Sequence, residues 1–329
     1  MQSKIMRRLA TKISQTAFDI QNSSLVKLFN ECDTEYQNSV FLAGTGRSGT
    51  TWLSNIINSK KRYRYIFEPF NPHAVSLCNN FNSKQYIRAD CQNSLFYEPV
   101  KQILSGSFRN KWSDRYCQNI LSKRRLIKSV RANLFLKWLH DNFPNLPIIL
   151  IIRNPIAVAN SRAKLDWGTS LGKYLCQDDL MQDYLAPFQN ELQQAQKYYQ
   201  KNKNIFENSI FTWCIEHYVP LKQFQYGEIK IVFYEEILGN PEPEIRSLMS
   251  FIGQNYDNSI LKEFENPSQM SRKDSAINLG KNSVDIWKND VGKNQIQKAK
   301  EILDIFGLKN IYPDNLPSRK ELERVMKAL

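Results

Sequence analysis

Four stretches of the 329-residue chain are wholly or largely apolar, and each has the length of a β-strand. Unbroken apolar strands are typical of a parallel sheet that helices cover on both faces. The four stretches are 39–43 (SVFLA), 146–152 (LPIILII), 228–234 (EIKIVFY) and the weaker 125–130 (RLIKSV). Between them apolar residues recur at helical spacing, which predicts helices over 51–59, 133–142, 155–165, 188–202, 208–225, 241–252, 293–306 and 318–328.

The alternation of strands and helices predicts an α/β fold in three layers, with a central, mostly parallel sheet flanked by helices. No linker rich in Pro, Gly and Ser divides the chain, and no internal repeat is visible. We therefore expect a single domain over residues 38–329, preceded by a basic helical extension over residues 1–37. Two polar insertions, near 75–120 and 165–185, are expected to shape the pocket for a substrate.

The charge balance limits the classes of ligand. The chain has 45 Lys and Arg against 32 Asp and Glu, a net charge of +13, which suits an anionic ligand, a nucleic acid or an anionic surface but also fits a merely basic composition. The longest aliphatic run, 148–152, is far shorter than the ~18 residues that a bilayer requires. The N-terminus lacks a secretory signal, so a cytoplasmic protein is expected, and contact of its basic helix with a membrane surface stays open. The six cysteines have no C-x-x-C spacing, and no metal site is expected.

The stretch 44–51 (GTGRSGTT) lies between the first strand and the first helix, as a phosphate-binding loop does. It nearly fits the pattern G-x-x-x-x-G-K-[ST], but Thr50 replaces the lysine and Arg47 is the only cation of the loop. Glycines let the backbone approach an anion, and the N–H groups of the following helix point at it. The candidate binding residues of this loop are Gly46, Arg47, Ser48, Gly49, Thr50 and Thr51.

A second candidate clamp for phosphate follows the stretch 146–152, which ends in Arg153 instead of a metal-binding aspartate. Ser161 lies about two turns into the next predicted helix. Ligands of open α/β sheets bind beyond the carboxyl ends of the strands, so both clamps are expected to serve one ligand with phosphates at separate places. The missing lysine and the missing acid argue against a triphosphate that is held with Mg²⁺.

Read together, the motifs GTGRSGTTWL and IIRNPIAVANSR resemble those of the sulfotransferases that use 3′-phosphoadenosine 5′-phosphosulfate (PAPS). The later IVFYEEILGNPEPEIRSLMSFIG is also similar to a segment of that family, so the resemblance covers about residues 38–306. It implies a sulfotransferase fold related to the P-loop NTPases, with PAPS as donor, adenosine 3′,5′-bisphosphate (PAP) as product and no metal. It further implies that the residues from Arg47 to Thr51 hold the 5′-phosphosulfate, that Arg153 and Ser161 hold the 3′-phosphate, and that Trp52 lies near the adenine.

Sulfuryl transfer needs a base that takes the proton of the acceptor. The cytosolic branch of the family carries Lys-Thr-His on its second strand, whereas this chain has Lys128-Ser129-Val130 and lacks that histidine. The segment 65–73 (YIFEPFNPH) offers Glu68, where the carbohydrate-type members carry a glutamate. We therefore predict Glu68 as the general base, with Lys128 and Arg47 as the catalytic cations, and a closer resemblance to the carbohydrate-type branch.

Other residues are predicted on the acceptor side and in a late loop. His73 is the second candidate for the base, and together with Arg131 and Trp167 it is predicted to contact the acceptor. The segment 271–290 has few apolar residues and several cations, and in the family a late basic loop closes over the 3′-phosphate and the adenine. Arg272 and Lys281 are its candidate binding residues.

The sequence thus predicts a sulfotransferase that acts on a hydroxyl group, or with less support an amine, of a carbohydrate, a glycolipid or a small natural product. One alternative is a nucleotide-dependent kinase or other phosphotransferase on the same loop, and the absent lysine argues against it. The other is a non-catalytic basic module that binds nucleic acid or a membrane. It does not account for two phosphate clamps after two strands, so nucleic acid is not expected as a partner. The oligomeric state is not specified by the sequence.

Overall fold

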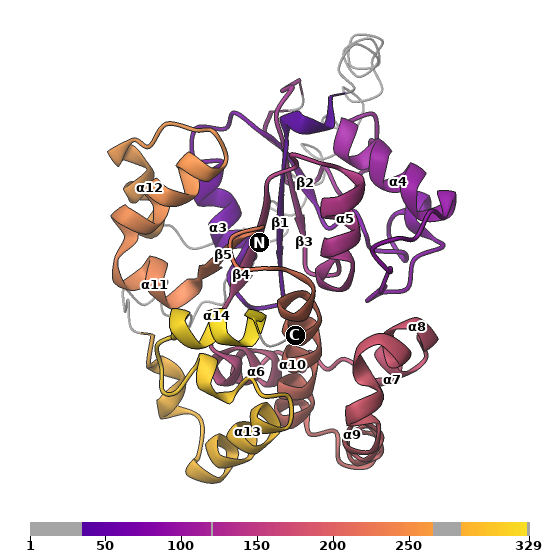
Figure 1. Ribbon diagram of the computed structural model, residues 1–329. Coiled ribbons are helices and arrows are strands. Elements are labelled where there is room, and N and C mark those ends of the chain that lie inside the picture. Colours follow the sequence, from indigo (N-terminus) through magenta and orange to yellow (C-terminus); the bar gives the residue numbers. More distant parts are fainter. Residues whose placement is uncertain (1–34, 120, 266–283, 328–329) are drawn as a thin grey trace, which may run out of the picture.

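The computed structural model of the protein describes residues 35–119, 121–265 and 284–327. Most of the predicted extension over 1–37 and much of the late segment 271–290, with Arg272 and Lys281, lie outside these ranges. The order of the elements along the chain and their arrangement in space are shown in Figure 1.

The strands form one five-stranded sheet in the order β2-β3-β1-β4-β5, and all four pairings are parallel. The predicted parallel sheet is therefore confirmed, together with its four predicted strands. The edge strand β2 was not predicted. The bounds of the strands are β1 Ser39–Gly44, β2 Arg64–Phe67, β3 Arg125–Ser129, β4 Ile148–Ile152 and β5 Lys230–Phe233.

All eight predicted helices are present, with ends that differ by a few residues from the prediction. They are α3 Thr50–Ile57, α5 Leu136–Asn142, α6 Pro155–Ala163, α9 Gln189–Asn202, α10 Ile205–Gln223, α12 Pro241–Phe251, α13 Lys293–Ile305 and α14 Arg319–Lys327. Within the described ranges, four helices were not predicted, namely α4 Ser94–Ser105, α7 Gly172–Leu175, α8 Asp178–Leu180 and α11 Tyr234–Gly239. The remaining short helical segments of the described ranges are η1 Tyr36–Asn38, η2 Ser76–Cys78, η3 Asn133–Phe135, η4 Met181–Leu185, η5 Ala186–Phe188, η6 Asn258–Glu265, η7 Ile286–Asn289 and η8 Lys309–Ile311.

The two faces of the sheet pack against different helices, as the alternation of side chains along a strand requires. In β1, Val40 and Leu42 point to the face that α3 and α12 cover, whereas Phe41 and Ala43 point to the face of α4, α5, α6 and α10. Figure 1 shows α3 and α12 on one side of the strands and α4 and α5 on the other. The predicted three layers are thus confirmed.

The carboxyl ends of the strands are level with one another, and this edge carries the candidate site. Phe67 of β2 is in register with Lys128 of β3, Ser129 with Ala43, and Gly44 with Ile151. The residues that follow β1, β2, β3 and β4 therefore emerge at the same edge. These residues include the glycine loop, Glu68, Arg131 and Arg153.

Candidate active site

The glycine loop between β1 and α3 has the tight backbone that its sequence predicts. Gly49 has a φ of 94°, in the left-handed region where glycine is favoured, and it immediately precedes α3. A Cβ at Gly49 would lie 2.6 Å from a ring carbon of Tyr234, so a larger residue does not fit there. Within the loop both the hydroxyl and the N–H of Ser48 donate to the carbonyl of Thr45, at 2.7 and 3.1 Å. The loop thus keeps a fixed shape by its own hydrogen bonds.

The two predicted phosphate clamps lie against each other. Arg47 donates from Nε to the hydroxyl of Ser161 at 3.1 Å, and Arg153 donates from Nη1 to the carbonyl of Arg47 at 3.1 Å. The Arg153 guanidinium also lies 4.3 Å from the ring centroid of Tyr234, and its Nε is buried without a hydrogen-bond partner among the described residues. Two guanidinium groups and a hydroxyl therefore meet beside the N-terminus of α3, and this arrangement suits an anion.

The start of α6 is anchored by residues that are distant in the sequence. The side chain of Asn154 caps the helix by accepting from the N–H groups of Ile156 and Ala157, and Pro155 occupies its first turn. The N–H of Asn154 in turn donates to the buried carboxylate of Glu235 at 2.9 Å, to which Tyr312 also donates at 2.8 Å. The strand–YEE–helix segment therefore fixes the helix that carries Ser161 and the residue next to Arg153.

The two tryptophans of the predicted site have different surroundings. Trp52 is 3% exposed and packs edge-on against Tyr234 within the core, so it offers little surface to an adenine in this conformation. Trp167 is 37% exposed, and its ring lies close to Gly46, where a Cβ would be 2.9 Å from it. Trp167 thus lies against the glycine loop and leaves part of its ring open to a ligand.

Glu68 lies directly after β2 and accepts hydrogen bonds from three donors. Lys128 donates from Nζ to Oε1 at 2.6 Å, Arg131 from Nη1 to Oε2 at 2.7 Å, and the N–H of Val130 to both oxygens at 3.1 and 3.2 Å. Glu68 is only 3% exposed and has a φ of 46°, which is uncommon for a residue with a side chain. Residues in such sparsely populated backbone regions cluster at functional sites.

The surroundings of Glu68 favour its ionised form. Burial alone would raise the pKa of this carboxyl, but the charges of Lys128 and Arg131 and the donated hydrogen bonds outweigh burial and lower the pKa. Glu68 is therefore a carboxylate at neutral pH, and it is a weak proton acceptor as long as both cations remain in contact with it.

Beside Glu68 the insertion carries a stacked cation and two aromatic rings. The guanidinium of Arg115 lies 3.4 Å from the ring centroid of Trp112 and 5.1 Å from that of Tyr116. It is also 4.7 Å from the centroid of Phe67, which directly precedes Glu68. The sequence analysis did not single out Arg115, although its place between two aromatic residues could have drawn attention to it.

His73 is not joined to this group by any contact of the described residues. It is exposed, and its backbone N–H donates to the side chain of Asn71 at 3.3 Å. The structure thus brings together Glu68, Lys128 and Arg131 and, separately, Arg47, Arg153 and Ser161. It leaves His73 at the surface of the first insertion.

Among the described residues, no three His, Cys, Asp or Glu side chains gather as a metal site would require. Within the same ranges, no helix is both long enough and apolar enough to span a bilayer.

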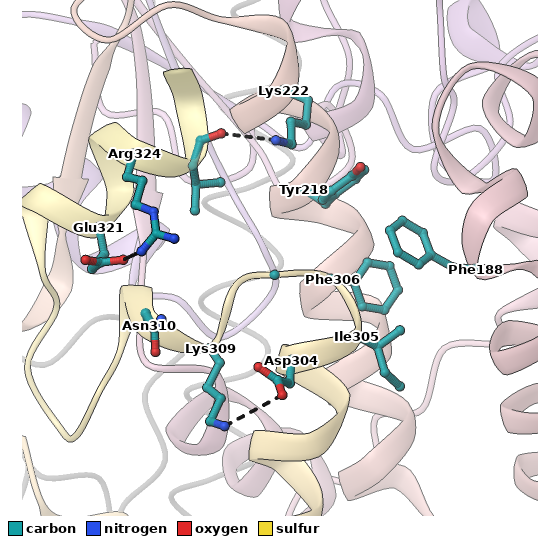
Figure 2. Close-up of a pocket in the computed structure, with 12 residues that line it drawn as sticks. Phe188, Tyr218, Lys222, Asp304, Ile305, Phe306, Lys309, Asn310, Glu321 and Arg324 are labelled. Carbon is teal, nitrogen blue, oxygen red and sulfur yellow. Dashed lines mark hydrogen bonds and ion pairs between the residues drawn. The ribbon is translucent and has the colours of Figure 1, made fainter. Parts of the chain in front are cut away.

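A separate pocket of about 450 Å³ lies between α10, the end of α13, η8 and α14 (Figure 2). One wall is formed by the packed rings of Phe188, Tyr218 and Phe306. Four charged groups of the pocket pair within it, since Lys309 lies 3.7 Å from Asp304, and Arg324 lies 3.3 Å from Glu321. None of the predicted site residues lines this pocket.

Comparison with known proteins decides the family. A family model described as the sulfotransferase domain matches residues 37–311. The chain belongs to this family. The sulfotransferase therefore catalyses sulfuryl transfer, and membership of the family implies PAPS as the donor. This favours the prediction of a sulfotransferase over the two alternatives, a kinase and a non-catalytic basic module.

Two curated proteins are similar in sequence to this sulfotransferase. An uncharacterized protein of Archaeoglobus fulgidus is 25% identical over 264 residues, which cover 65% of this chain and 83% of that protein. The nodulation protein NoeE of Sinorhizobium fredii is 30% identical over 140 residues, which cover 41% of this chain and 33% of NoeE. The matched region thus spans only a third of NoeE.

Solved structures of sulfotransferases are similar at low identity. The sulfotransferase domain from the Curacin biosynthetic pathway is 14% identical, with 80% of this chain and 95% of that chain covered and a TM-score of 0.45. Mouse sulfotransferase SULT7A1, solved complexed with PAP, is 14% identical, with 88% and 87% covered and a TM-score of 0.42. At these scores the likeness adds nothing to the assignment that the family model makes.

Proposed function

We propose that the enzyme transfers the sulfuryl group of PAPS to a hydroxyl of a carbohydrate, a glycolipid or a small natural product, with Glu68 as the general base. One observation carries the proposal. A buried carboxylate, held by Lys128, Arg131 and a backbone N–H, lies at the same edge of the sheet as the adjoining clamps of Arg47, Ser161 and Arg153. A base and an anion site at one edge are what transfer from an anionic donor to a protonated acceptor requires.

The donor is assigned to the clamp residues and the glycine loop. The glycine loop from Arg47 to Thr51, with the start of α3, would hold the 5′-phosphosulfate. Arg153 and Ser161 would hold the 3′-phosphate, and the buried Nε of Arg153 is a donor without a partner among the described residues. Because Arg47 contacts both clamps, it would stabilise charge on either phosphate.

Lys128 is assigned to the transferring group. Its neighbour Leu126 lies on the α3 face of β3, and side chains two positions apart in a strand share a face. Lys128 therefore belongs to the face where α3 begins after the glycine loop, and its Nζ lies 4.8 Å from the ring of Phe67. In this position its ammonium group can neutralise charge that develops between the donor and Glu68.

The reaction balances without a further reactant. The acceptor oxygen bonds to sulfur, its proton passes to a Glu68 oxygen, and the bond from sulfur to the bridging phosphate oxygen breaks with its electrons kept by PAP. For Glu68 to take the proton, one of its cations must turn away. Arg131 is the candidate, because its side chain is 22% exposed whereas that of Lys128 is 6% exposed. Arg131 would then contact the acceptor or the donor.

The acceptor is assigned to the side of the site that the insertions form. The rings of Trp167 and Tyr116 offer flat apolar surfaces of the kind on which a sugar or another ring can stack. His73 is the remaining candidate for an acceptor contact. The assignment of the acceptor class rests on these aromatic surfaces and on the resemblance to the carbohydrate-type branch, which carries a glutamate at the end of the short apolar segment after the first helix.

Two measurements test the proposal. Thermal unfolding with PAP should show stabilisation of the protein, whereas ATP with Mg²⁺ should give a smaller effect or none. A mass-spectrometric screen of hydroxyl-bearing carbohydrates, glycolipids and natural products with PAPS should then reveal a sulfated product. If millimolar PAP leaves the melting temperature unchanged, the assignment of the donor site is wrong.

A further inference from the structure

A second buried ion pair lies beneath the candidate site. Glu216, in the middle of α10, is 0% exposed, and Lys84, from the insertion between η2 and α4, is 8% exposed. The ammonium of Lys84 forms a short ion pair with Oε1 of Glu216, to which Tyr174 also donates at 2.7 Å. An isolated charge at such depth is costly, so the two residues depend on each other.

The pair reaches the candidate base through the backbone of one residue. Nζ of Lys84 also donates to the carbonyl of Val130 at 2.6 Å. The N–H of Val130 donates to both carboxylate oxygens of Glu68, and the next residue, Arg131, supplies the guanidinium on Glu68. Lys84 therefore holds the peptide group between Val130 and Arg131, and both of these residues donate to Glu68.

We propose that the ion pair of Lys84 and Glu216 is a positioning device for the proposed general base, because it fixes the backbone of Val130 and Arg131 in the place where both donate to Glu68. This inference rests on the proposed function of Glu68. Lys84 and Glu216 are positioning residues in this scheme, since the contacts place them behind Val130 and not on Glu68 itself.

The other charged and titratable groups around the device come from several elements. Glu68 faces Lys128 of β3, and Arg115 and Tyr65 lie close enough to feel its charge. Glu216 faces Arg162 of α6 and Tyr174 of α7, and His217 follows it in α10. Because Lys128 remains on Glu68 when the device is broken, the expected effect on Glu68 is partial.

Loss of the ion pair between Lys84 and Glu216 should change the pKa of Glu68 in a predictable direction. When Lys84 no longer holds Val130, the Val130 N–H and the Arg131 guanidinium are less well placed on Glu68. Both interactions favour the carboxylate form of Glu68, so its pKa should rise toward that of an ordinary glutamate. A residue that only filled space would change stability without changing this pKa.

The double variant K84M/E216Q removes both charges and keeps an acceptor for Tyr174. A matched control is R64M/D114N, which removes another buried pair, in which both side chains are 1% exposed. Arg64 is the first residue of β2, at the opposite end of the strand from Glu68, and bonds to Asp114 at 2.9 and 3.1 Å. The two variants thus lose comparable buried pairs at different distances from the site.

The readout is the titration of the Glu68 carboxyl in full-length protein with ¹³C-labelled glutamate, followed by NMR and assigned with Glu68→Gln. It requires no acceptor. In K84M/E216Q the pKa of Glu68 should rise by about 0.5–1 pH unit, whereas R64M/D114N should leave it within about 0.2. Lys84→Arg, which keeps the positive charge, should leave the pKa of Glu68 close to its wild-type value.

An unchanged Glu68 titration in K84M/E216Q would overturn the inference, as would an equal rise in R64M/D114N. If K84M/E216Q does not fold, K84Q/E216Q takes its place, because two amides remove both charges and can still form hydrogen bonds in the buried site. A rise in the pKa of Glu68 then supports the device, and an unchanged pKa overturns it. Failure of the proposed function is a separate result, because it appears as absent binding of PAP or as full activity of Glu68→Gln.

Discussion

The guanidinium of Arg47 donates to the hydroxyl of Ser161 at 3.1 Å, so that the glycine loop and α6 meet although they are far apart in the sequence. Arg153 closes the group from the other side by its bond to the carbonyl of Arg47. The two clamps that the sequence assigns to different phosphates are therefore joined through Arg47. Substitution in one clamp is expected to weaken the other.

Removal of Arg47 should lower affinity for PAP. We expect Arg47→Ala to raise the dissociation constant by about 10–100-fold, because a charge-assisted bond contributes about 1.5–3 kcal/mol. Ser161→Ala should have a smaller effect, and the double variant should show less than the sum of both in calorimetry. Arg324→Ala, a cation in the pocket of Figure 2, is the control and should leave the affinity unchanged.

Substitution of Gly49 should lower the free energy of unfolding for two reasons, backbone strain and a clash with Tyr234. A comparison with Gly227 separates the two. Gly49 and Gly227 both have positive φ, at 94° and 98°, but only Gly49 has a neighbouring ring in the place of a Cβ. Gly227→Ala should therefore cost about 1–2 kcal/mol of unfolding free energy from backbone strain alone. Gly49→Ala should cost about 2–4 kcal/mol in urea unfolding, because Tyr234 must also move. Equal losses in the two variants would show that the contact with Tyr234 does not matter.

The buried His217 should make stability depend on pH. Burial lowers its pKa to about 4, while its Nδ1 bonds to the carbonyl of Trp213 at 2.7 Å. In the unfolded chain His217 takes up a proton near pH 6.5, whereas in the folded protein it does so only near pH 4. The stability that neutral His217 allows is therefore fully present above pH 6.5 and is lost as the pH falls toward 4. Between pH 7.5 and 5.5 the wild type should lose about 1 kcal/mol more than His217→Gln in urea unfolding. A loss of equal size in both proteins would contradict this origin.

The pH profile of transfer separates the two candidate bases. The lowered pKa of Glu68 keeps its carboxylate ionised above about pH 5, so Glu68 should produce no acid limb between pH 5 and 8. A base that changes its charge within this range would produce such a limb. An acid limb between pH 5 and 8 that disappears in His73→Gln would assign the proton to His73 instead.

The fold was predictable where burial follows local pattern. The strands β1, β4 and β5 lie in apolar runs, β3 contains the weaker pattern RLIKS, and long helices such as α10 show helical periodicity over many residues. The strand β2 was missed because it is four residues long and starts with Arg64, whose burial depends on Asp114 fifty positions away. The helix α4 was missed because Pro99 interrupts its pattern, although Asn93 caps it and Val100, Ile103 and Leu104 are buried.

The residues of the candidate site were predictable where they belong to short sequence motifs, whereas most contacts between them were not. The glycine loop, Arg153 and Ser161 stand in ordered motifs, Lys128 lies near the end of a predicted strand, and Glu68 could be proposed from the family resemblance. The contacts of Glu68 with Arg131 and Val130 and the pair of Lys84 and Glu216 join residues from separate elements. No local pattern reveals such pairs, because a charged residue in an apolar stretch gives no sign of its partner.

The most direct test of the account is the rate of sulfuryl transfer by Glu68→Gln, measured with labelled PAPS and an acceptor from the screen, beside its affinity for PAP by calorimetry. The amide cannot take a proton but is similar in size to the carboxyl group. We predict transfer at least ~100-fold slower than in the wild type, with affinity for PAP within about threefold. Transfer by Glu68→Gln at the wild-type rate would contradict the account.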